Sequence, residues 1–462
     1  MPPHETASLL ETRASMTPRS DARTPLRTLT LALLLALSAT PSQAQDADRA
    51  RPEPRRPSLL ERLRAQRGEW RLELKLAAAQ LRGTLEQGLH KLEPSWKPAT
   101  HGRGSLSLGP GGLPILRLKG SPEEMGEQHG VLLKDQIRVL MQIYVPAFLG
   151  SDLDSARREA KAFLPHISER HRRELRALAK ASGQTFGDVL LGHCFPDQYR
   201  AWGCSCVTAT GAARGAAGPL FGRNLDFIDM GFLHRFSLIV IFEPDQGPRF
   251  VSLTFPGMIG VISGLNEWGL ASAVMVVHSG GCKPGTPFGL LFRGLLETQR
   301  DTAGVGAQLA SAAITVGNNL MVCDAKGAAR VFELNNSEPR CVARGPDSRG
   351  LLFSTNHHAS PTNKRTRLSA VFLSSRRRYQ QLEDCCAGDG PVTLETIKQG
   401  LEDTAPKIAN VQSMVFAPAT RELHVAFGRK PAAAGRLTKL GRSLLFPLRN
   451  PAKPQKQEPK TP

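Results

Sequence analysis

Residues that can do chemistry are concentrated in one stretch, Gly203–Phe227, which reads GCSCVTATGAARGAAGPLFGRNLDF. A cysteine is a nucleophile as its thiolate, and a nearby cation lowers the pKa of the thiol. Arg223 is a permanent cation, and Asp226 can hold an ammonium group. The stretch therefore indicates a nucleophile, Cys204 or its neighbour Cys206, with the groups that tune it. The alternatives are a disulfide or metal hairpin, or two buried small cysteines beside a surface ion pair.

Two strands and a turn are needed to bring these groups together. We expect a strand with Cys204, a turn over Gly215–Gly218 and a returning strand over Gly222–Asp226. The chain after this point consists of short β-branched or aromatic runs bounded by Gly, Pro or Asn, and blocks of helical pattern separate these runs. Strands in runs, separated by blocks of helices, favour an α+β fold over a regular βαβ sheet.

The chain ahead of the cysteines is mostly helical in pattern. Ile115–Leu118 resembles a short strand, and Gly102–Gly112 is expected to be a loop. Ser121 and Glu124 form a capping box at the start of a helix. Within this helix Gly126 and Gly130 are four residues apart, so they predict a face that another backbone can approach closely.

The N-terminus has the pattern of a secretory signal. Arg23 and Arg27 precede an apolar run that ends near Ala39, and Pro41 and the small-residue site at Ala44 follow. The run is too short to span a bilayer, and the alternatives are an uncleaved anchor or a short core helix. The sequence therefore predicts an exported protein, periplasmic or secreted, with no integral membrane segment in the mature chain.

Charge and cysteine usage exclude several classes of protein. The net charge is +19, yet no helix-turn-helix, zinc finger or aromatic platform accompanies it, so nucleic-acid binding is not expected. Export permits disulfides, and Cys323 and Cys341 are candidates for one. No CxxC pair and no His cluster at zinc spacing occurs among the residues, so neither a metal site nor a cofactor is predicted.

The pattern as a whole resembles the N-terminal nucleophile (Ntn) hydrolases of the acyl-CoA:6-aminopenicillanic acid acyltransferase type, peptidase family C45, which are related to bile salt hydrolases and acid ceramidase. The resemblance begins with Gly-Cys-Ser followed by Gly-Arg-Asn-x-Asp. It continues in LKGSPEEMGEQHG, GVISGLNEWGL, FSTNHH, SSRRRY and NVQSMVFAPATRELHVAFG, in the family's order. It covers about Ile115 to Gly428.

The resemblance implies a four-layer αββα sandwich, an α+β fold in which two antiparallel sheets lie between helix layers. It also implies autocatalytic cutting of the Gly203–Cys204 bond, after which Cys204 provides both the thiol nucleophile and, through its α-amine, the base. A free α-amine titrates at about 7.7–8.0, so it can act as a general base near neutral pH. Arg223 matches the arginine that stabilises the thiolate, and Asp226 matches the carboxylate that holds the α-ammonium.

Four further residues take roles from the same resemblance. Asn356 matches an asparagine near the oxyanion site, where its amide can donate to the tetrahedral oxygen. Arg378 matches an arginine that supports the site through hydrogen bonds. Asn266 has a supporting or substrate-binding position, with a turn cap as the alternative, and His278 lies where the family places an oxyanion or pocket backbone group. Cys206 departs from the family, in which many relatives have serine.

These expectations divide the chain into five parts. They are a signal peptide over 1–44, a linker and amphipathic helix extension over 45–112, and a helical prosegment over 113–203, which would be the small (alpha) fragment. The catalytic domain, or beta fragment, covers 204–428, and a basic, Pro-rich disordered tail covers 429–462.

The function expected is that of an exported hydrolase, which cleaves the linear amide bond of a small N-acyl substrate through an acyl-Cys204 thioester. Its other partners would be its own alpha and beta fragments after self-cleavage. The alternatives are an acyltransferase with an amine acceptor, a cysteine hydrolase without self-cleavage that uses His357 as its base, and a non-catalytic envelope protein with a basic tail.

Overall fold

Two β-sheets organise the protein in the computed structural model, which describes residues 92–149, 153–198, 203–363 and 370–448. All of these residues belong to one compact unit, Ser58–Pro462. The expected signal peptide, the linker, the amphipathic helix and the last residues of the tail lie outside the described residues. No helix of the described part is long and apolar enough to cross a membrane.

The larger sheet has ten strands in the order β1-β2-β3-β6-β7-β8-β9-β10-β11-β12. Every neighbouring pair is antiparallel except β3 and β6, which run parallel. The strands are β1 (Ala99–His101), β2 (Gly104–Leu108), β3 (Pro114–Gly120), β6 (Leu238–Pro244), β7 (Phe250–Thr254), β8 (Ser263–Asn266), β9 (Ala271–Val276), β10 (Asn318–Cys323), β11 (Ala329–Leu334) and β12 (Cys341–Arg344).

The smaller sheet has six strands in the order β13-β4-β5-β14-β15-β16, all antiparallel. Its central pair, β4 and β5, contains the cysteines and the Arg-Asn-x-Asp cluster, so the hairpin expected from the sequence is confirmed. The strands are β13 (Leu351–Ser354), β4 (Gly203–Ala209), β5 (Leu220–Asp226), β14 (Asn410–Ala417), β15 (Glu422–Phe427) and β16 (Thr438–Leu440).

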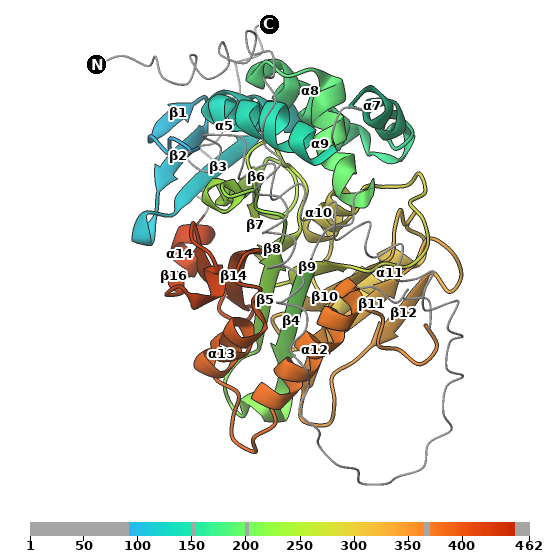
Figure 1. Ribbon diagram of the computed structural model, residues 1–462. Helices are drawn as coiled ribbons and strands as arrows, with labels where there is room; N and C mark the ends of the chain where they lie inside the picture. The colour runs from blue at the N-terminus through green and yellow to red at the C-terminus, as the bar shows by residue number, and fades with distance from the viewer. Residues whose placement is uncertain (1–91, 150–152, 199–202, 364–369, 449–462) are drawn as a thin grey trace, which may run out of the picture. The chain divides into compact units, whose positions relative to one another are not determined.

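Helices cover the outer face of each sheet, as Figure 1 shows. On the larger sheet α4 packs against β3, and α10 packs against β8 and β9; on the smaller sheet α12 packs against β4, and α13 against β5. The helices are α4 (Pro122–Leu132), α5 (Lys134–Val139), α6 (Val145–Leu149), α7 (Leu153–Lys161), α8 (Glu169–Ser182), α9 (Phe186–Gln198), α10 (Phe288–Thr298), α11 (Thr302–Ala310), α12 (Ala370–Cys385), α13 (Leu394–Thr404) and α14 (Arg442–Leu445).

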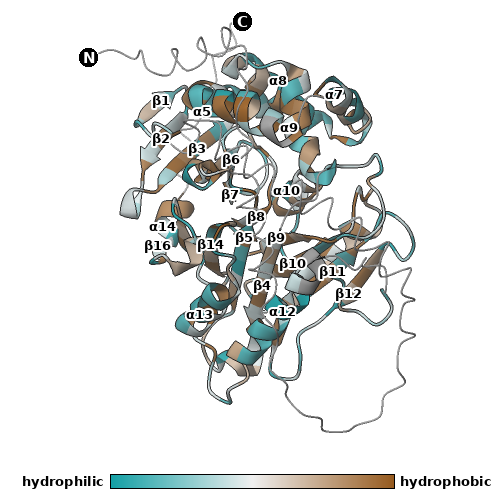
Figure 2. Cartoon of the chain, viewed as in Figure 1, coloured by the Kyte–Doolittle hydropathy of each residue, from teal (hydrophilic) through white to brown (hydrophobic). Residues whose placement is uncertain are grey.

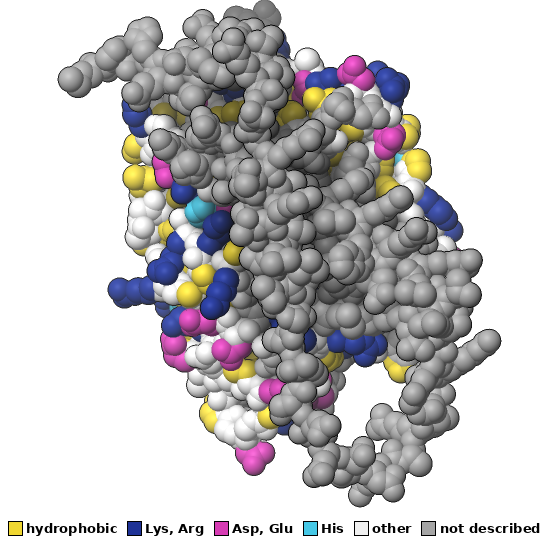
Figure 3. All heavy atoms as spheres, in the orientation of Figure 1, with side chains coloured by type: hydrophobic (Ala, Val, Ile, Leu, Met, Phe, Trp, Pro, Cys, Tyr) yellow, Lys and Arg dark blue, Asp and Glu magenta, His cyan; other side chains and the backbone are white. Residues whose placement is uncertain are grey.

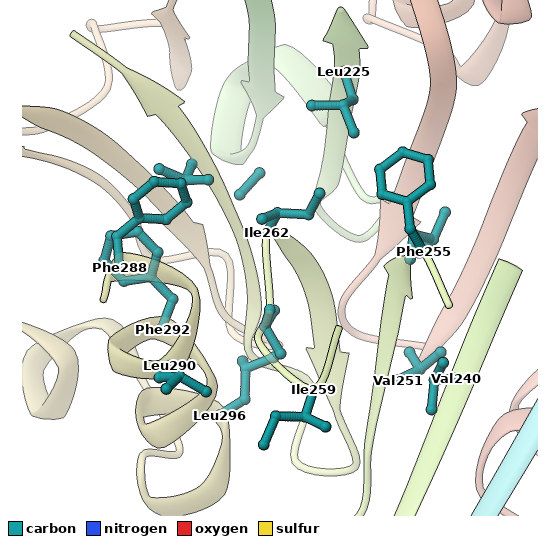
Figure 4. Packing of buried hydrophobic residues seen from close by; sticks show 14 of the residues in the cluster. Leu225, Val240, Val251, Phe255, Ile259, Ile262, Phe288, Leu290, Phe292 and Leu296 are labelled. Atoms are coloured by element: carbon teal, nitrogen blue, oxygen red, sulfur yellow. The ribbon is translucent and has the colours of Figure 1, made fainter. Parts of the chain in front are cut away.

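The two sheets pack face to face, because β4 of one contacts β9 of the other. With the outer helices, this gives the four-layer α+β sandwich that the resemblance implied, with the parallel β3–β6 pair as its departure from two purely antiparallel sheets. The strands colour mainly as hydrophobic in Figure 2, and Figure 4 shows part of the resulting core, including Leu225, Ile262 and Phe288. A separate apolar cluster, including Val207, Leu382 and Ile397, lies between the smaller sheet and its helices.

The predicted start of α4 and its close contact with another helix are both confirmed. The Ser121 side chain accepts from Glu124 N, and the Glu124 carboxylate accepts from Ser121 N, which completes the capping box. A Cβ on Gly126 would collide with the backbone carbonyl of Glu174 on α8, and a Cβ on Gly130 would collide with that of Leu178. Both glycines therefore allow the two helix backbones to lie in contact.

Two expected boundaries are wrong. Residues 104–108 form β2 rather than a loop, so the end of the 45–112 extension belongs to the larger sheet; the period-two alternation of Gly-Ser-Leu-Ser-Leu marks the strand. The tail also does not begin at 429, because 432–434, 438–440 and 442–445 are ordered. Leu440 and Leu445 are fully buried, which stabilises this segment despite its basic composition.

Cys323 and Cys341 do not form a disulfide. Cys323 pairs with Ala329 at one end of β11, whereas Cys341 pairs with Leu334 at the other end. All eight cysteines are free thiols in this structure.

Candidate active site

The β4–β5 ladder sets the positions of the candidate catalytic groups. Gly203 lies opposite Asp226, and Cys206 lies opposite Arg223. Successive side chains of a strand point to opposite faces of the sheet. Cys204 and Cys206 accordingly face the core between the sheets, whereas Val207 belongs to the cluster beneath α12 and α13.

Arg223 is fully buried on the same inner face as the two thiols. Its Nε donates to Ser263 Oγ of β8 at 2.8 Å, and its Nη1 donates to the carbonyl oxygen of Asn224 at 2.9 Å. Its third nitrogen, Nη2, has no oxygen or nitrogen acceptor among the described residues. The guanidinium is thus anchored from the larger sheet, and its charge lowers the pKa of both Cys204 and Cys206.

Burial opposes this effect and dominates it. Burial raises the pKa of the Cys204 thiol above its ordinary value, while Arg223 and Arg378 lower it and Asp226 raises it. Burial likewise raises the pKa of Cys206, to about 12. Both cysteines are therefore neutral thiols at neutral pH in this structure, so a base is needed before either can attack a carbonyl.

Asn356 and Arg378 hold the backbone of Cys204 from two sides. Cys204 N donates to Asn356 Oδ1 at 2.7 Å, and Arg378 Nη1 donates to the Cys204 carbonyl oxygen. Arg378 also donates to Ser205 Oγ and to Asn356 Oδ1, each at 2.9 Å. Asn356 Nδ2 donates to the Val276 carbonyl oxygen at 2.9 Å, which fixes the orientation of the amide. The nucleophile candidate is thus clamped through its main chain.

Asp226 lies next to the peptide bond that precedes Cys204. A Cβ added to Gly203 would lie 3.2 Å from Asp226 Oδ2, and this oxygen accepts no hydrogen bond within the described residues. Burial raises the pKa of Asp226, and Arg378, Asn410 and Arg223 lower it. The arrangement provides a free, buried carboxylate oxygen where an α-ammonium group of Cys204 would form.

The structure does not bring every sequence-derived residue to this cluster. Asn266 is the last residue of β8, where its Oδ1 accepts from Trp268 N and Leu270 N of the following turn, and its Nδ2 donates to Leu296 O and Gln299 O. Its amide is thus engaged in holding the turn. His278 lies half-buried in the loop after β9, two residues beyond the Val276 carbonyl that Asn356 contacts.

His357, the alternative base, is engaged elsewhere. Its Nδ1 lies 2.8 Å from Ser375 Oγ and 3.1 Å from Thr355 Oγ1, and its ring lies beside that of Tyr379, with the centroids 5.5 Å apart. Burial lowers its pKa to about 4. These contacts turn the imidazole toward α12.

Four supporting residues were missed from the sequence. Ser263 anchors Arg223, Ser205 accepts from Arg378, and Asn410 donates to Asp226 at 2.9 Å. Asn319 donates to the carbonyl oxygens of Thr355 and His357, which flank Asn356. Ser205 was adjacent to the nucleophile and detectable, whereas the other three depend on contacts between distant segments. In the described part of the chain, no group of three or more His, Cys, Asp or Glu side chains is arranged to hold a metal ion.

The region around this cluster is similar to a known protein family. Residues 213–421 match the model of the acyl-coenzyme A:6-aminopenicillanic acid acyl-transferase family. The similarity to that family covers a little under half of the chain. The matched acyl-transferase region includes Arg223, Asp226, Asn356 and Arg378, and it begins after Cys204. The family is named for an acyl-transfer reaction.

Individual relatives are more distant. An uncharacterized protein of Archaeoglobus fulgidus is 27% identical over 37% of this chain and 34% of its own length. The protein dcd1B of Dictyostelium discoideum is 27% identical over 40% of this chain and 42% of its own length. The chain thus matches less than half of the length of each of these relatives. An N-acylethanolamine-hydrolyzing acid amidase ortholog from Caenorhabditis elegans is 18% identical, over 47% of this chain and 93% of that chain, with a TM-score of 0.37.

Proposed function

We propose that the chain is an exported cysteine hydrolase of the Ntn type, which cuts itself before Cys204 and then cleaves the linear amide bond of a small N-acyl substrate. The match of residues 213–421 to an acyl-transferase family supports amide or acyl chemistry. The observation on which the proposal depends is the set of groups around Cys204: Arg223 for the thiolate, Asp226 beside its amine position, and a clamp on its main chain.

The first step is self-cleavage of the Gly203–Cys204 bond. Cys204 Sγ attacks the Gly203 carbonyl carbon and the C–N bond breaks. The Cys204 nitrogen keeps its own hydrogen and the electron pair of the broken bond, and takes up the thiol proton to become a free amine. Water then hydrolyses the resulting thioester, which releases a Gly203 carboxylate and restores the thiol. Asp226 Oδ2, which accepts no other hydrogen bond in the described residues, supports this step because it can accept from the new amine.

Turnover uses the same groups on an external amide. The α-amine takes the thiol proton, and the thiolate attacks the substrate carbonyl. Asn356 Nδ2 is the donor we assign to the oxyanion. The proton passes to the leaving amine as the amide C–N bond breaks, and water hydrolyses the acyl thioester to the free acid.

Acyl transfer is the second candidate, because the matched family is named for it. An amine in place of water would then resolve the thioester. Adding hydroxylamine to a turnover assay distinguishes the two: a transferase gives mainly the hydroxamate at amine concentrations where a hydrolase still gives mainly the acid.

The proposal is tested by intact mass and N-terminal sequencing of the purified protein, together with paired cysteine variants. We expect two fragments, the larger one beginning at Cys204, and hydrolysis of at least one member of a panel of N-acyl p-nitroanilides. Cys204→Ala should abolish both cutting and hydrolysis, whereas Cys206→Ala should keep both. An uncut chain that hydrolyses amides would contradict the amine-base mechanism, and an active Cys204→Ala variant would contradict the nucleophile.

The same measurements test export. Sequencing of the small fragment should show an N-terminus close to Ala44 rather than Met1 when the protein is made with its own leader. A small fragment that retains Met1 would contradict export by this signal.

A further inference from the structure

A side chain from the neighbouring strand β14 orients the Asp226 carboxylate. Asn410, the first residue of β14, lies opposite Asp226 in the β5–β14 ladder, and its Nδ2 donates to Asp226 Oδ1 at 2.9 Å. A register shift between Asn410 and Gln412 interrupts the ladder at this point. Both Asn410 and Asp226 are buried, so water does not compete for the bond.

This bond occupies one carboxylate oxygen and leaves the other for the nucleophile. Oδ1 is fixed by Asn410, while Oδ2 lies beside Gly203 without a hydrogen bond in the described part of the chain. A partial rotation of the carboxylate out of its plane would break the bond to Asn410. Asn410 therefore fixes the plane of the carboxylate so that its second oxygen faces the N-terminal end of β4.

Asn410 is itself fixed by the C-terminal segment. Ala433 N donates to Asn410 Oδ1 at 2.8 Å, so the amide must direct its Nδ2 toward Asp226. Ala433 lies in the short turn Ala432–Ala434 and is buried. Lys430 anchors the same segment through an ion pair with Asp229 at 2.6 Å.

We propose that Asn410 is a positioning residue for Asp226, and that the segment Lys430–Ala434 belongs to the active site because it orients Asn410. This inference rests on the proposed function, since the task of Asp226 is to hold the α-ammonium of a freed Cys204. The segment lies beyond the family-matched region, which ends at residue 421.

The electrostatics agree with this role. Asp226 is surrounded by Arg378 of α12, Arg223 of its own strand, Asn410 of β14 and Cys204 of β4. Burial raises the pKa of Asp226, and the bond from Asn410 is one of three contributions that lower it. Without the donor, the effect of burial is less opposed and the pKa of Asp226 rises further. Asp226 then takes up a proton at higher pH, and as a neutral acid it can no longer hold an ammonium group.

The test is the pH dependence of kcat/KM for the variant Asn410→Asp. Its carboxylate can still accept from Ala433 N, so the C-terminal anchor is kept, but it offers Asp226 a like charge instead of a donor. We expect the acid limb of the profile to move to higher pH by at least about one unit, with KM little changed at high pH. Asn410→Ala, which removes both the donor and the acceptor, should move the acid limb in the same direction. It replaces Asn410→Asp in the test if that variant does not fold.

Gln412→Glu is the matched control. It makes the same change from amide to acid on the same strand, but Gln412 donates to Ser237 Oγ and Thr254 O rather than to Asp226. Its acid limb should coincide with that of the wild type even where its melting temperature falls.

The outcomes separate this inference from the proposed function. An uncut, inactive wild type would overturn both. If the wild type is cut and active, two results would overturn the inference alone. One is an acid limb of Asn410→Asp that coincides with that of the wild type, and the other is an acid limb of Gln412→Glu that moves as far as that of Asn410→Asp.

Discussion

Replacing Arg378 by lysine should damage the site while keeping its charge. Arg378 is 3% exposed, and its two terminal nitrogens donate to three acceptors: the Cys204 carbonyl oxygen, Ser205 Oγ and Asn356 Oδ1. A lysine ammonium is a single point on a flexible stem and cannot reproduce the fork of a guanidinium. We expect it to keep one of the three bonds and to lose the other two.

The size of the effect follows from those two bonds. A hydrogen bond from a charged donor contributes about 1.5 kcal/mol at the lower end of its range, so losing two costs about 3 kcal/mol. If the loss falls on the transition state, kcat/KM drops by about two orders of magnitude. Self-cleavage should slow by a similar factor, because the same clamp holds Cys204 during both reactions.

The assay combines the rate of fragment formation, read by intact mass, with kcat/KM on the best N-acyl p-nitroanilide. Arg377→Lys is the matched control, because Arg377 is an exposed neighbour on the same helix. A folded Arg378→Lys enzyme within threefold of the wild type in both rates would refute the reasoning, since it would mean that the clamp does not contribute to catalysis.

Two further predictions concern stability. Burial lowers the pKa of His129 to about 3 and that of His193 to about 4, so both imidazoles are neutral in the folded state. Below about pH 6.5 the unfolded chain binds more protons than the folded one, so the free energy of unfolding should fall as pH drops toward 4. The expected slope is up to about 1.4 kcal/mol per pH unit for each histidine. A urea midpoint that is independent of pH in this window would contradict the prediction. Glu174→Ala should cost about 3 kcal/mol, because Arg293, which is 0% exposed, loses the carboxylate that it contacts at 2.6 and 2.8 Å and keeps Glu297 as its remaining ion-pair partner within the described residues. Urea unfolding at pH 7 measures this cost, and a loss below about 1 kcal/mol would show that the pair does not need both partners.

The local sequence pattern was sufficient to predict the elements around the nucleophile. The β4–β5 hairpin, the capping box of α4 and the contact face at Gly126 and Gly130 all depend on residues close together in the chain. The period of two along β4 also placed Cys204 and Cys206 on one face. This explains Cys206 in part: it lies opposite Arg223 and shares the guanidinium with Cys204.

Contacts between distant segments could not be derived in this way. Asn410 and Ser263 are ordinary polar residues in apolar strands, and their roles appear only once β14 and β8 lie next to β5 and Arg223. The C-terminal segment was misjudged because its few apolar residues, such as Leu440, are outnumbered by Lys, Arg and Pro. On the face shown in Figure 3, the visible basic side chains of the described part lie interspersed with acidic ones.

If the chain is cut before Cys204, the parallel pair β3–β6, the only such pair in the described sheets, would join two separate polypeptides. Every strand of the smaller sheet lies at or after the cut, so that sheet would stay within one fragment, apart from Gly203. The larger sheet would be shared: β1–β3 come from the small fragment, and β6–β12 from the large one. The seam would be the ladder from Ile115–Ile239 to Gly120–Pro244, continuous hydrogen bonding between two separate polypeptides. Such a protein would migrate as one species under native conditions and could not be rebuilt by expressing the large fragment alone, because its β6 would then be an open sheet edge.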